Sequence, residues 1–278
     1  MPQMEHEWLI RSGAFVAILI SMLAWEFVVP LHHGRESRLR HDARNLAVLL
    51  LDSLTVRLVL PILPVGLAQL ATERNWGLFN HLPLAPWLSV GLTIVAFDLA
   101  IYLQHLTFHA VPVLWRLHMV HHSDLQFDAT TGVRFHPIEI ALSAGVKLGL
   151  VLILGPPAVG VMVFEILLNA SSLFNHANAR LLLSLDRWLR WIIVTPDMHR
   201  VHHSADRPET NSNFGFNLPW WDRVFRTYRD QPRAGHGEMI IGLEHLRNPH
   251  HLTLGRLLVM PFLGTGGVYP MIRPRDDG

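Results

Sequence analysis

The sequence predicts an all-α integral membrane protein with about four membrane helical elements and a histidine-rich helical cap, and three observations support this. Hydrophobic residues make up 50% of the 278 residues and charged residues only 16%, whereas soluble domains average about 25% charged residues. Four apolar stretches are each long enough to cross a bilayer, which takes ~20 residues. Histidines then recur at helical spacing beyond the third stretch.

The four apolar stretches cover residues 8–30, 46–70, 86–103 and 138–174. The first follows two glutamates and is not followed by an A-x-A motif, so we expect a retained helix rather than a cleaved signal peptide. The last is too long for one crossing and contains Gly155-Pro156-Pro157. Because proline breaks a helix, this stretch predicts a helical hairpin.

Arginine distribution predicts the orientation. Residues 31–44 contain four arginines, whereas residues 71–85 contain only Arg74. By the positive-inside rule the first of these loops is cytoplasmic. Three crossings then place the histidine-rich segments on the cytoplasmic side, provided that the hairpin enters and leaves by that same face. The arginines of the first loop are Arg35, Arg38, Arg40 and Arg44.

Three regions are expected along the chain. Residues 1–85 form the N-terminal membrane helices, 86–230 the histidine-box domain and 231–278 a C-terminal cytoplasmic tail. Within the second region, residues 180–200 combine Trp188 and Trp191 with several arginines, which is typical of an amphipathic helix at a membrane interface. We expect Pro196 to break this helix before the last histidine-rich segment.

Ten histidines between residues 105 and 203 make up three boxes and two single positions. On a helix, residues three and four apart share one face, with Cβ atoms roughly 5–6 Å apart, so the outer histidines of each H-x2-H-H box point the same way. Imidazole is the commonest metal-ligating side chain, and a bound cation prevents such a cluster from repelling itself. The histidines are His105 and His109 (H-x3-H), His118, His121 and His122, His199, His202 and His203 (both H-x2-H-H), and the single His136 and His176.

The ligand type leaves the metal open, because imidazole suits iron, zinc, copper and nickel. Cysteine is absent, so nitrogen and oxygen must supply the ligands. A zinc-containing membrane hydrolase and a non-catalytic metal-binding membrane protein are two functions to consider for such a cluster, although the H-E-x-x-H motif of a zinc hydrolase is absent. A transporter would place its ligands near the membrane midplane. A net charge of +1 gives no reason to expect nucleic acid.

Further motifs around the histidines resemble those of the fatty acid hydroxylase/sterol desaturase superfamily over residues 97–228. Two positions depart from its pattern: Leu106 stands where arginine is frequent, and 225–227 reads F-R-T rather than F-G-T. The matching motifs are D-x3-Y-x2-H-x3-H at 98–109, L-W-R-L-H at 114–118, V-H-H-S at 120–123, R-x-H-P-x-E at 134–139, F-N-H-A-N at 174–178, T-P-D-M-H-R-V-H-H-S at 195–204, N-S-N-F-G at 211–215 and W-W-D-R at 220–223.

This resemblance implies two iron ions, O2 as co-substrate, and hydroxylation or desaturation of a fatty acyl chain, sterol, carotenoid or related lipid. It also implies electrons from a separate donor, such as ferredoxin or cytochrome b5 with its reductase. We expect a bacterial inner-membrane protein, with the endoplasmic reticulum as the alternative. His136 is either a tenth ligand or a supporting residue. The expected ligands, which are also the catalytic residues, are His105, His109, His118, His121, His122, His176, His199, His202 and His203.

Ligating imidazoles usually donate their second N–H to a carboxylate, amide or carbonyl. Asp98 lies seven residues before His105 on the same helical face, and an acid within a membrane segment is costly and usually functional. The alternative for Asp98 is a pair with an arginine, and for Asp124 and Asp197 a loop acid or helix cap. The full set of expected supporting residues is Asp98, Asp124, Asn178, Asp197 and Asn213.

Overall fold

Helices dominate the computed structural model, which describes residues 6–32, 37–264, 267 and 269–271. Within those ranges the β-structure is limited to two isolated bridges, Pro30 with Ala179 and Ser204 with Ile241. The predicted all-α class is therefore confirmed. Arg35, used above to orient the chain, lies outside the described residues.

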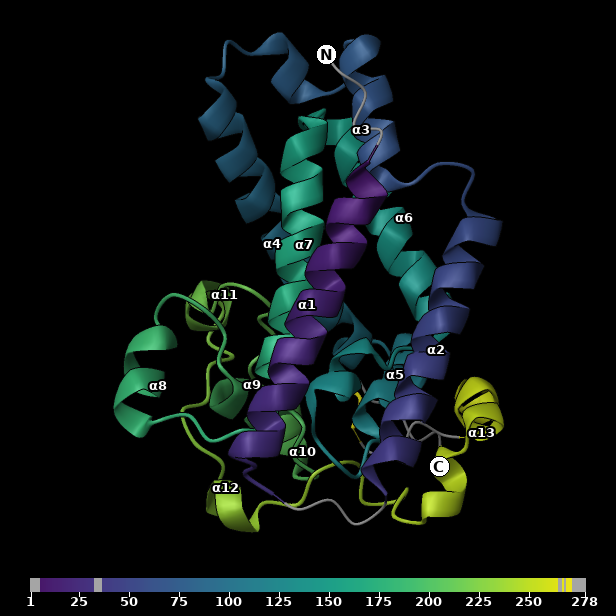
Figure 1. Ribbon diagram of the computed structural model, residues 1–278, viewed down its shortest axis with the longest axis vertical. Helices are drawn as coiled ribbons and strands as arrows, with labels where there is room; N and C mark the ends of the chain where they lie inside the picture. The colour runs from purple at the N-terminus through teal and green to yellow at the C-terminus, as the bar shows by residue number, and fades with distance from the viewer. Residues whose placement is uncertain (1–5, 33–36, 265–266, 268, 272–278) are drawn as a thin grey trace, which may run out of the picture.

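Among the described residues, five helical segments are long and apolar enough to cross a membrane. The predicted hairpin was counted as one of about four membrane elements, and its two legs are separate helices, which makes five. All five run along the long axis of the molecule (Figure 1). They are α1 (Glu7–Val28), α2 (Arg38–Val59) with the α3 that follows it (Pro64–Glu73), α4 (Pro86–Ala110), α6 (Pro137–Leu154) and α7 (Ala158–Asn175).

The hairpin of α6 and α7 turns at Gly155, where φ is +60°. A Cβ atom at this position would lie 2.1 Å from the carbonyl oxygen of Trp76, so only glycine fits. The amide of Asn80 donates to the carbonyl oxygens of Trp76 and Gly155, at 2.6 and 3.2 Å. The turn therefore packs against the connection between α3 and α4, and α7 returns to the end at which α6 began, as predicted.

Shorter helices gather in the lower half of the molecule in Figure 1, where α4 and α7 end. The expected interfacial helix within residues 180–200 is α8, and the expected break at Pro196 separates it from α9. The shorter elements are α5 (Pro112–His122), α8 (Leu183–Leu189), α9 (Pro196–His202), α10 (Arg207–Thr210), α11 (Trp220–Val224), α12 (Gly235–Glu238), α13 (Leu254–Val259) and the 3-10 turns η1 (Leu78–His81), η2 (Ala129–Val133), η3 (Pro249–Leu252) and η4 (Met260–Phe262).

Two apolar cores hold these elements together. The first lies between the membrane helices and includes Phe97 and Phe164, whose ring centroids are 5.3 Å apart. The second packs Trp115 of α5 against Leu257 and Tyr269 from the C-terminal region. The segment expected as a tail thus supplies buried side chains that pack against α5, the helix that carries the second histidine box.

Candidate metal centre

Four stretches of chain bring nine histidines to one end of the bundle. The last two turns of α4 carry the first box, and α5 carries the second. His176 follows α7, and α9 with the residue after it carries the third box. Proline occupies the first turn of both α5 and α9, where its missing N–H costs nothing. Pro112 and Pro196 therefore set where these two helices begin, and hence where the boxes point.

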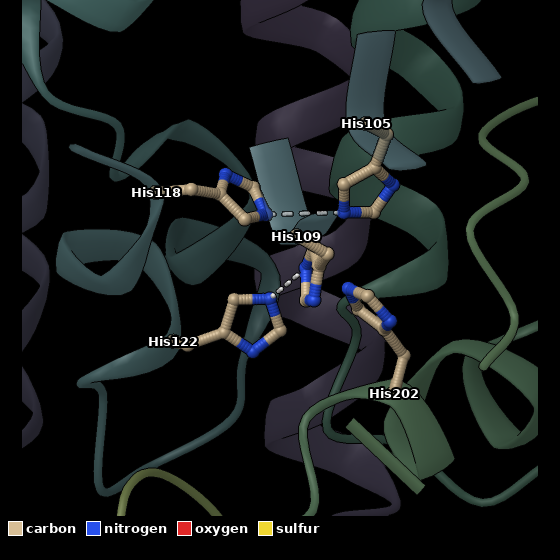
Figure 2. A group of neighbouring side chains, drawn as sticks. All are labelled: His105, His109, His118, His122 and His202. Carbon is tan, nitrogen blue, oxygen red and sulfur yellow. Dashed lines mark hydrogen bonds between the residues drawn. The ribbon is translucent and has the colours of Figure 1, made fainter. Parts of the chain in front are cut away.

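The nine imidazoles form two groups, and all nine are buried. In each group every residue offers one ligand atom, and these atoms lie within 4.8 Å of one another. Figure 2 shows the rings of the first group converging on a common centre. The first group is His105, His109, His118, His122 and His202, and the second is His121, His176, His199 and His203.

Each H-x2-H-H box contributes to both groups. His118 and His122 enter the first group, whereas His199 and His203 enter the second. These are the outer positions of each box, four residues apart on one helical face. The middle histidine of each box crosses to the other group. Both α5 and the segment of α9 therefore contribute histidines to both groups, rather than to one group each.

Backbone carbonyls fix two rings of the first group. Nδ1 of His105 donates to the carbonyl oxygen of Phe214 at 2.8 Å, and Nδ1 of His202 donates to that of Ser212 at 2.7 Å. A carbonyl oxygen only accepts, so the ring proton of the neutral imidazole is on Nδ1. The Nε2 atoms of His105 and His202 therefore carry unshared lone pairs.

Side-chain oxygens fix two further rings. Nδ1 of His118 donates to Oε1 of Glu139 at 2.6 Å, and Nδ1 of His109 donates to Oδ1 of Asn211 at 3.1 Å. Again the proton lies on Nδ1, and Nε2 is left with its lone pair. Glu139 and Asn211 were not among the expected supporting residues, although both stand in the superfamily motifs, at R-x-H-P-x-E and N-S-N-F-G.

Four inward-facing nitrogens of the first group carry no proton, because the ring protons of His105, His109, His118 and His202 lie on Nδ1. Nε2 of His105 lies 3.1 Å from Nε2 of His118, and the same distance separates these atoms in His109 and His122. The buried Nε2 of His202 has no hydrogen-bond partner among the described residues. Lone pairs facing one another at this distance repel unless a cation lies between them. The donor set therefore fits a bound metal ion.

The second group is held differently. Nδ1 of His176 donates to the carbonyl oxygen of Ser172 at 2.7 Å, so its Nε2 faces the group with a lone pair. That Nε2 lies 3.1–3.2 Å from Nε2 of His121, His199 and His203. The Nδ1 atoms of these three rings have no partner within the described part of the chain. One anchored ring and three packed rings thus offer a four-nitrogen site.

Burial keeps these imidazoles neutral, which is the form that binds metal. Burial lowers the pKa of His118 to about 3 and that of His176 to about 4. For His122, His202 and His203, burial and then the neighbouring imidazoles hold the pKa well below its usual value. The cluster is therefore ready to accept cations at neutral pH without first losing protons.

The expected supporting residues bind other groups. The carboxylate of Asp98 accepts from Asn217 and Trp221 at 2.8 Å, which ties α4 to the segment that follows Phe216. Asp124 faces Nε2 of His41 at 2.9 Å. The other three expected supporting residues also form hydrogen bonds away from the histidine groups: Asn178 with His32, Asp197 with Arg200, and Asn213 with Met198 and Arg229.

His136 lies outside both groups. Its Nδ1 accepts from the backbone N–H of Ile138 at 3.2 Å, and its Nε2 donates to the carbonyl oxygen of Leu258 at 3.1 Å. Both ring nitrogens are thus occupied in capping α6 and in holding α13. The structure does not bring His136 to either metal site.

A cavity of about 320 Å³ reaches the first group at His105 and His118 and continues between the membrane helices. Its apolar walls include Phe108, Phe135 and Phe216. An apolar passage that ends at two candidate ligands is a suitable place for an alkyl chain.

Comparisons with known proteins agree on one family. The family model described as "Fatty acid hydroxylase" matches residues 90–227. The ornithine lipid hydroxylase OlsE of Rhizobium tropici is 31% identical over 151 residues, which are 54% of this chain and 44% of that protein. The alkylglycerol monooxygenase of Xenopus tropicalis is 29% identical over 161 residues, covering 58% of this chain and 34% of that enzyme.

The alkylglycerol monooxygenase of Danio rerio is 28% identical over 192 residues, covering 68% of this chain and 41% of that enzyme. The chain thus spans less than half the length of these relatives. No solved structure matches the chain significantly.

Proposed function

Because the chain belongs to the fatty acid hydroxylase/sterol desaturase superfamily, we propose that it is an O2-dependent membrane oxidoreductase that hydroxylates a lipid at two iron ions. The observation that supports this most is the set of inward-facing Nε2 lone pairs in the two buried histidine groups. The five histidines of the first group would hold one iron and the four of the second the other. When bound, such a pair supplies the activation of O2 that an unreactive C–H bond requires.

The chain's own residues prepare this site in two ways. Glu139 and Asn211 keep the Nδ1 protons of His118 and His109 away from the metal side, so that Nε2 is free to ligate. Phe108, Phe135 and Phe216 supply apolar surface along the approach to His105. An alkyl chain in that cavity would present a C–H bond to the first histidine group.

Hydroxylation rather than desaturation is proposed because the relatives carry the names hydroxylase and monooxygenase. Their named substrates, an ornithine lipid and an alkylglycerol, suggest a polar lipid with long alkyl chains. Electrons would come from a separate donor, such as ferredoxin or cytochrome b5 with its reductase. We place the histidine end on the cytoplasmic side of a bacterial inner membrane, from the arginines of the first loop.

Metal analysis and lipid analysis together test this proposal. Protein purified in mild detergent from iron-supplemented cells should hold about two irons per chain, because each histidine group offers enough nitrogens for one metal ion. Cells that express it should accumulate a lipid with one added oxygen atom, and cells that express His202→Ala should not. Stoichiometric zinc that iron does not displace, without O2 consumption in the presence of reductant, would support a zinc hydrolase instead.

A further inference from the structure

The cavity that begins at the histidines ends among charged side chains inside the membrane helices. Glu165 of α7 is shared by two cations: its Oε2 lies 2.8 Å from Nη2 of Arg11, and its Oε1 lies 2.9 Å from Nζ of Lys147. All three residues line the cavity. Charges within a membrane segment are costly and usually mark a functional site.

Positive charge is in excess at this end. Arg57 of α2 also lines the cavity and makes no ion pair with another described residue. Three cations thus face two carboxylates, Glu165 and Glu7, the second of which pairs with Arg11 at 3.3 Å without lining the cavity. An anionic group of a ligand would balance the excess.

Acidic side chains line the opposite end, next to the histidines. Glu139 accepts from His118, and both Glu139 and Asp52 line the cavity. Asp52 is only 3% exposed, and its Oδ1 has no hydrogen-bond partner among the described residues. These acids offer an anion no favourable partner, so only the end at Arg11, Arg57 and Lys147 attracts an anionic group of a ligand.

The distance between the two ends suits an alkyl chain. Lys147 follows Glu139 by eight positions on α6, a rise of about 12 Å at 1.5 Å per residue. The walls between them are apolar and include Ile101, Val133 and Phe135. An amphiphile with one charged end and one extended chain matches this arrangement.

We propose that the cavity binds a lipid with an anionic carboxylate or phosphate at Arg11, Arg57 and Lys147, and with its alkyl chain directed toward His105 and His118. The direction of oxidation rests on the function proposed above, whereas the binding does not. The oxidised carbon would then lie roughly ten bonds from the anionic group, since single carbon–carbon bonds are ~1.5 Å long and an extended chain zigzags.

Binding of four straight-chain probes to the iron-loaded protein in detergent tests the proposal. The probes are hexadecyl phosphate, palmitate, hexadecanol and hexadecylamine. We expect at least one of the two anions to bind about tenfold more tightly than hexadecanol, because charge-assisted hydrogen bonds are the stronger ones. Preference for the phosphate would indicate a phospholipid headgroup, and preference for palmitate a carboxylate.

Two variants and a control locate the effect. Lys147→Gln should remove most of the preference for the anion, and Arg57→Gln should weaken it without disturbing an ion pair. The control is Arg40→Gln, in the exposed first turn of the same helix as Arg57 and away from the cavity. Hexadecanol or hexadecylamine binding as tightly as both anions, or an unchanged preference in both variants, would overturn the proposal.

The same probes separate this inference from the proposed function. If chelated protein, which lacks metal, keeps the preference for anions while no lipid is oxidised by the iron-loaded enzyme, the oxygenase proposal fails and the binding site stands. If the enzyme oxidises a lipid but neither variant changes anion binding, the binding site fails and the oxygenase stands.

Discussion

The two histidine groups differ in how the chain holds their rings. In the first group, four of five imidazoles donate Nδ1 to an oxygen, two of them to backbone carbonyls. In the second group only His176 does so. The ring of His121 is instead stacked on Phe135, with the ring centroids 4.4 Å apart, and the ring of His203 packs against Phe127, with the centroids 5.0 Å apart.

This difference indicates two levels of preorganisation. Hydrogen bonds fix both the orientation and the tautomer of a ligating ring, whereas aromatic packing fixes only its place. The rings of the first group are therefore already oriented before a metal ion binds, whereas the rings of the second group would reach their final orientation only when the ion is bound. We expect a chelator to remove metal from the second group first.

The largest expected effect is the loss of a ligand from either group. His109→Ala and His199→Ala should each lower lipid hydroxylation by more than about 100-fold, since loss of a ligand should exceed the 10–100-fold effect of an outer partner. Activity in membranes with a reductant present measures this. His81→Ala, in the exposed turn η1, is the matched control and should retain activity. Full activity in either site variant would contradict the shared role of the two groups.

A smaller effect is expected from the oxygens that anchor the first group. Glu139→Ala and Asn211→Ala should weaken metal binding there by roughly 10–100-fold, with no change in the second group. Glu139→Gln should restore most of the affinity, because its amide oxygen still accepts from His118. Titration of chelated protein with iron measures the two sites separately. Equal weakening of both sites would show that the groups are not held independently.

Acid should destabilise the metal-free protein. His176 and His118 have a pKa lowered from 6.5 to about 4 and about 3, so between pH 6.5 and 4 the unfolded chain binds more protons than the folded one. Stability present above pH 6.5 is then lost as the pH falls. Chelated protein should lose at least about 4 °C in Tm over this window. Iron-loaded protein should resist until the metal is released, and a flat profile of the chelated protein would refute the buried neutral cluster.

The smallest effect is expected at His136. Since its ring caps α6 and contacts Leu258 and Phe262, His136→Ala should cost about 1 kcal/mol of stability and leave the metal content unchanged. Thermal unfolding and metal analysis of the same preparation check both parts. A variant that loses one metal ion would restore His136 to the ligand set.

The membrane fold could be predicted because its signals are local. Apolar length gives the spanning helices, and Gly155 with the following prolines gives the hairpin. The break at Pro196 was predicted as well, whereas the interfacial helix that precedes it is shorter than expected, at Leu183–Leu189. The packing of residues such as Tyr269 against Trp115 was missed, because no periodicity in the tail indicates its partner.

The site was predictable within each box but not between boxes. Helical spacing alone brings His118 beside His122. The pairing of His109 with Asn211 joins residues 102 positions apart, and sequence spacing carries no information on such a contact. Asp98 illustrates the same limit: its position on the face of His105 suggested a direct bond, yet its carboxylate binds Asn217 and Trp221, which position the segment that carries Phe214.

Anomalous X-ray scattering at the iron edge, from crystals of the iron-loaded protein, would test the central claim most directly. Two peaks per chain are predicted, one between the Nε2 atoms of His105, His109, His118, His122 and His202 and one between those of His121, His176, His199 and His203. A single peak, or a peak outside these two groups, would contradict the account.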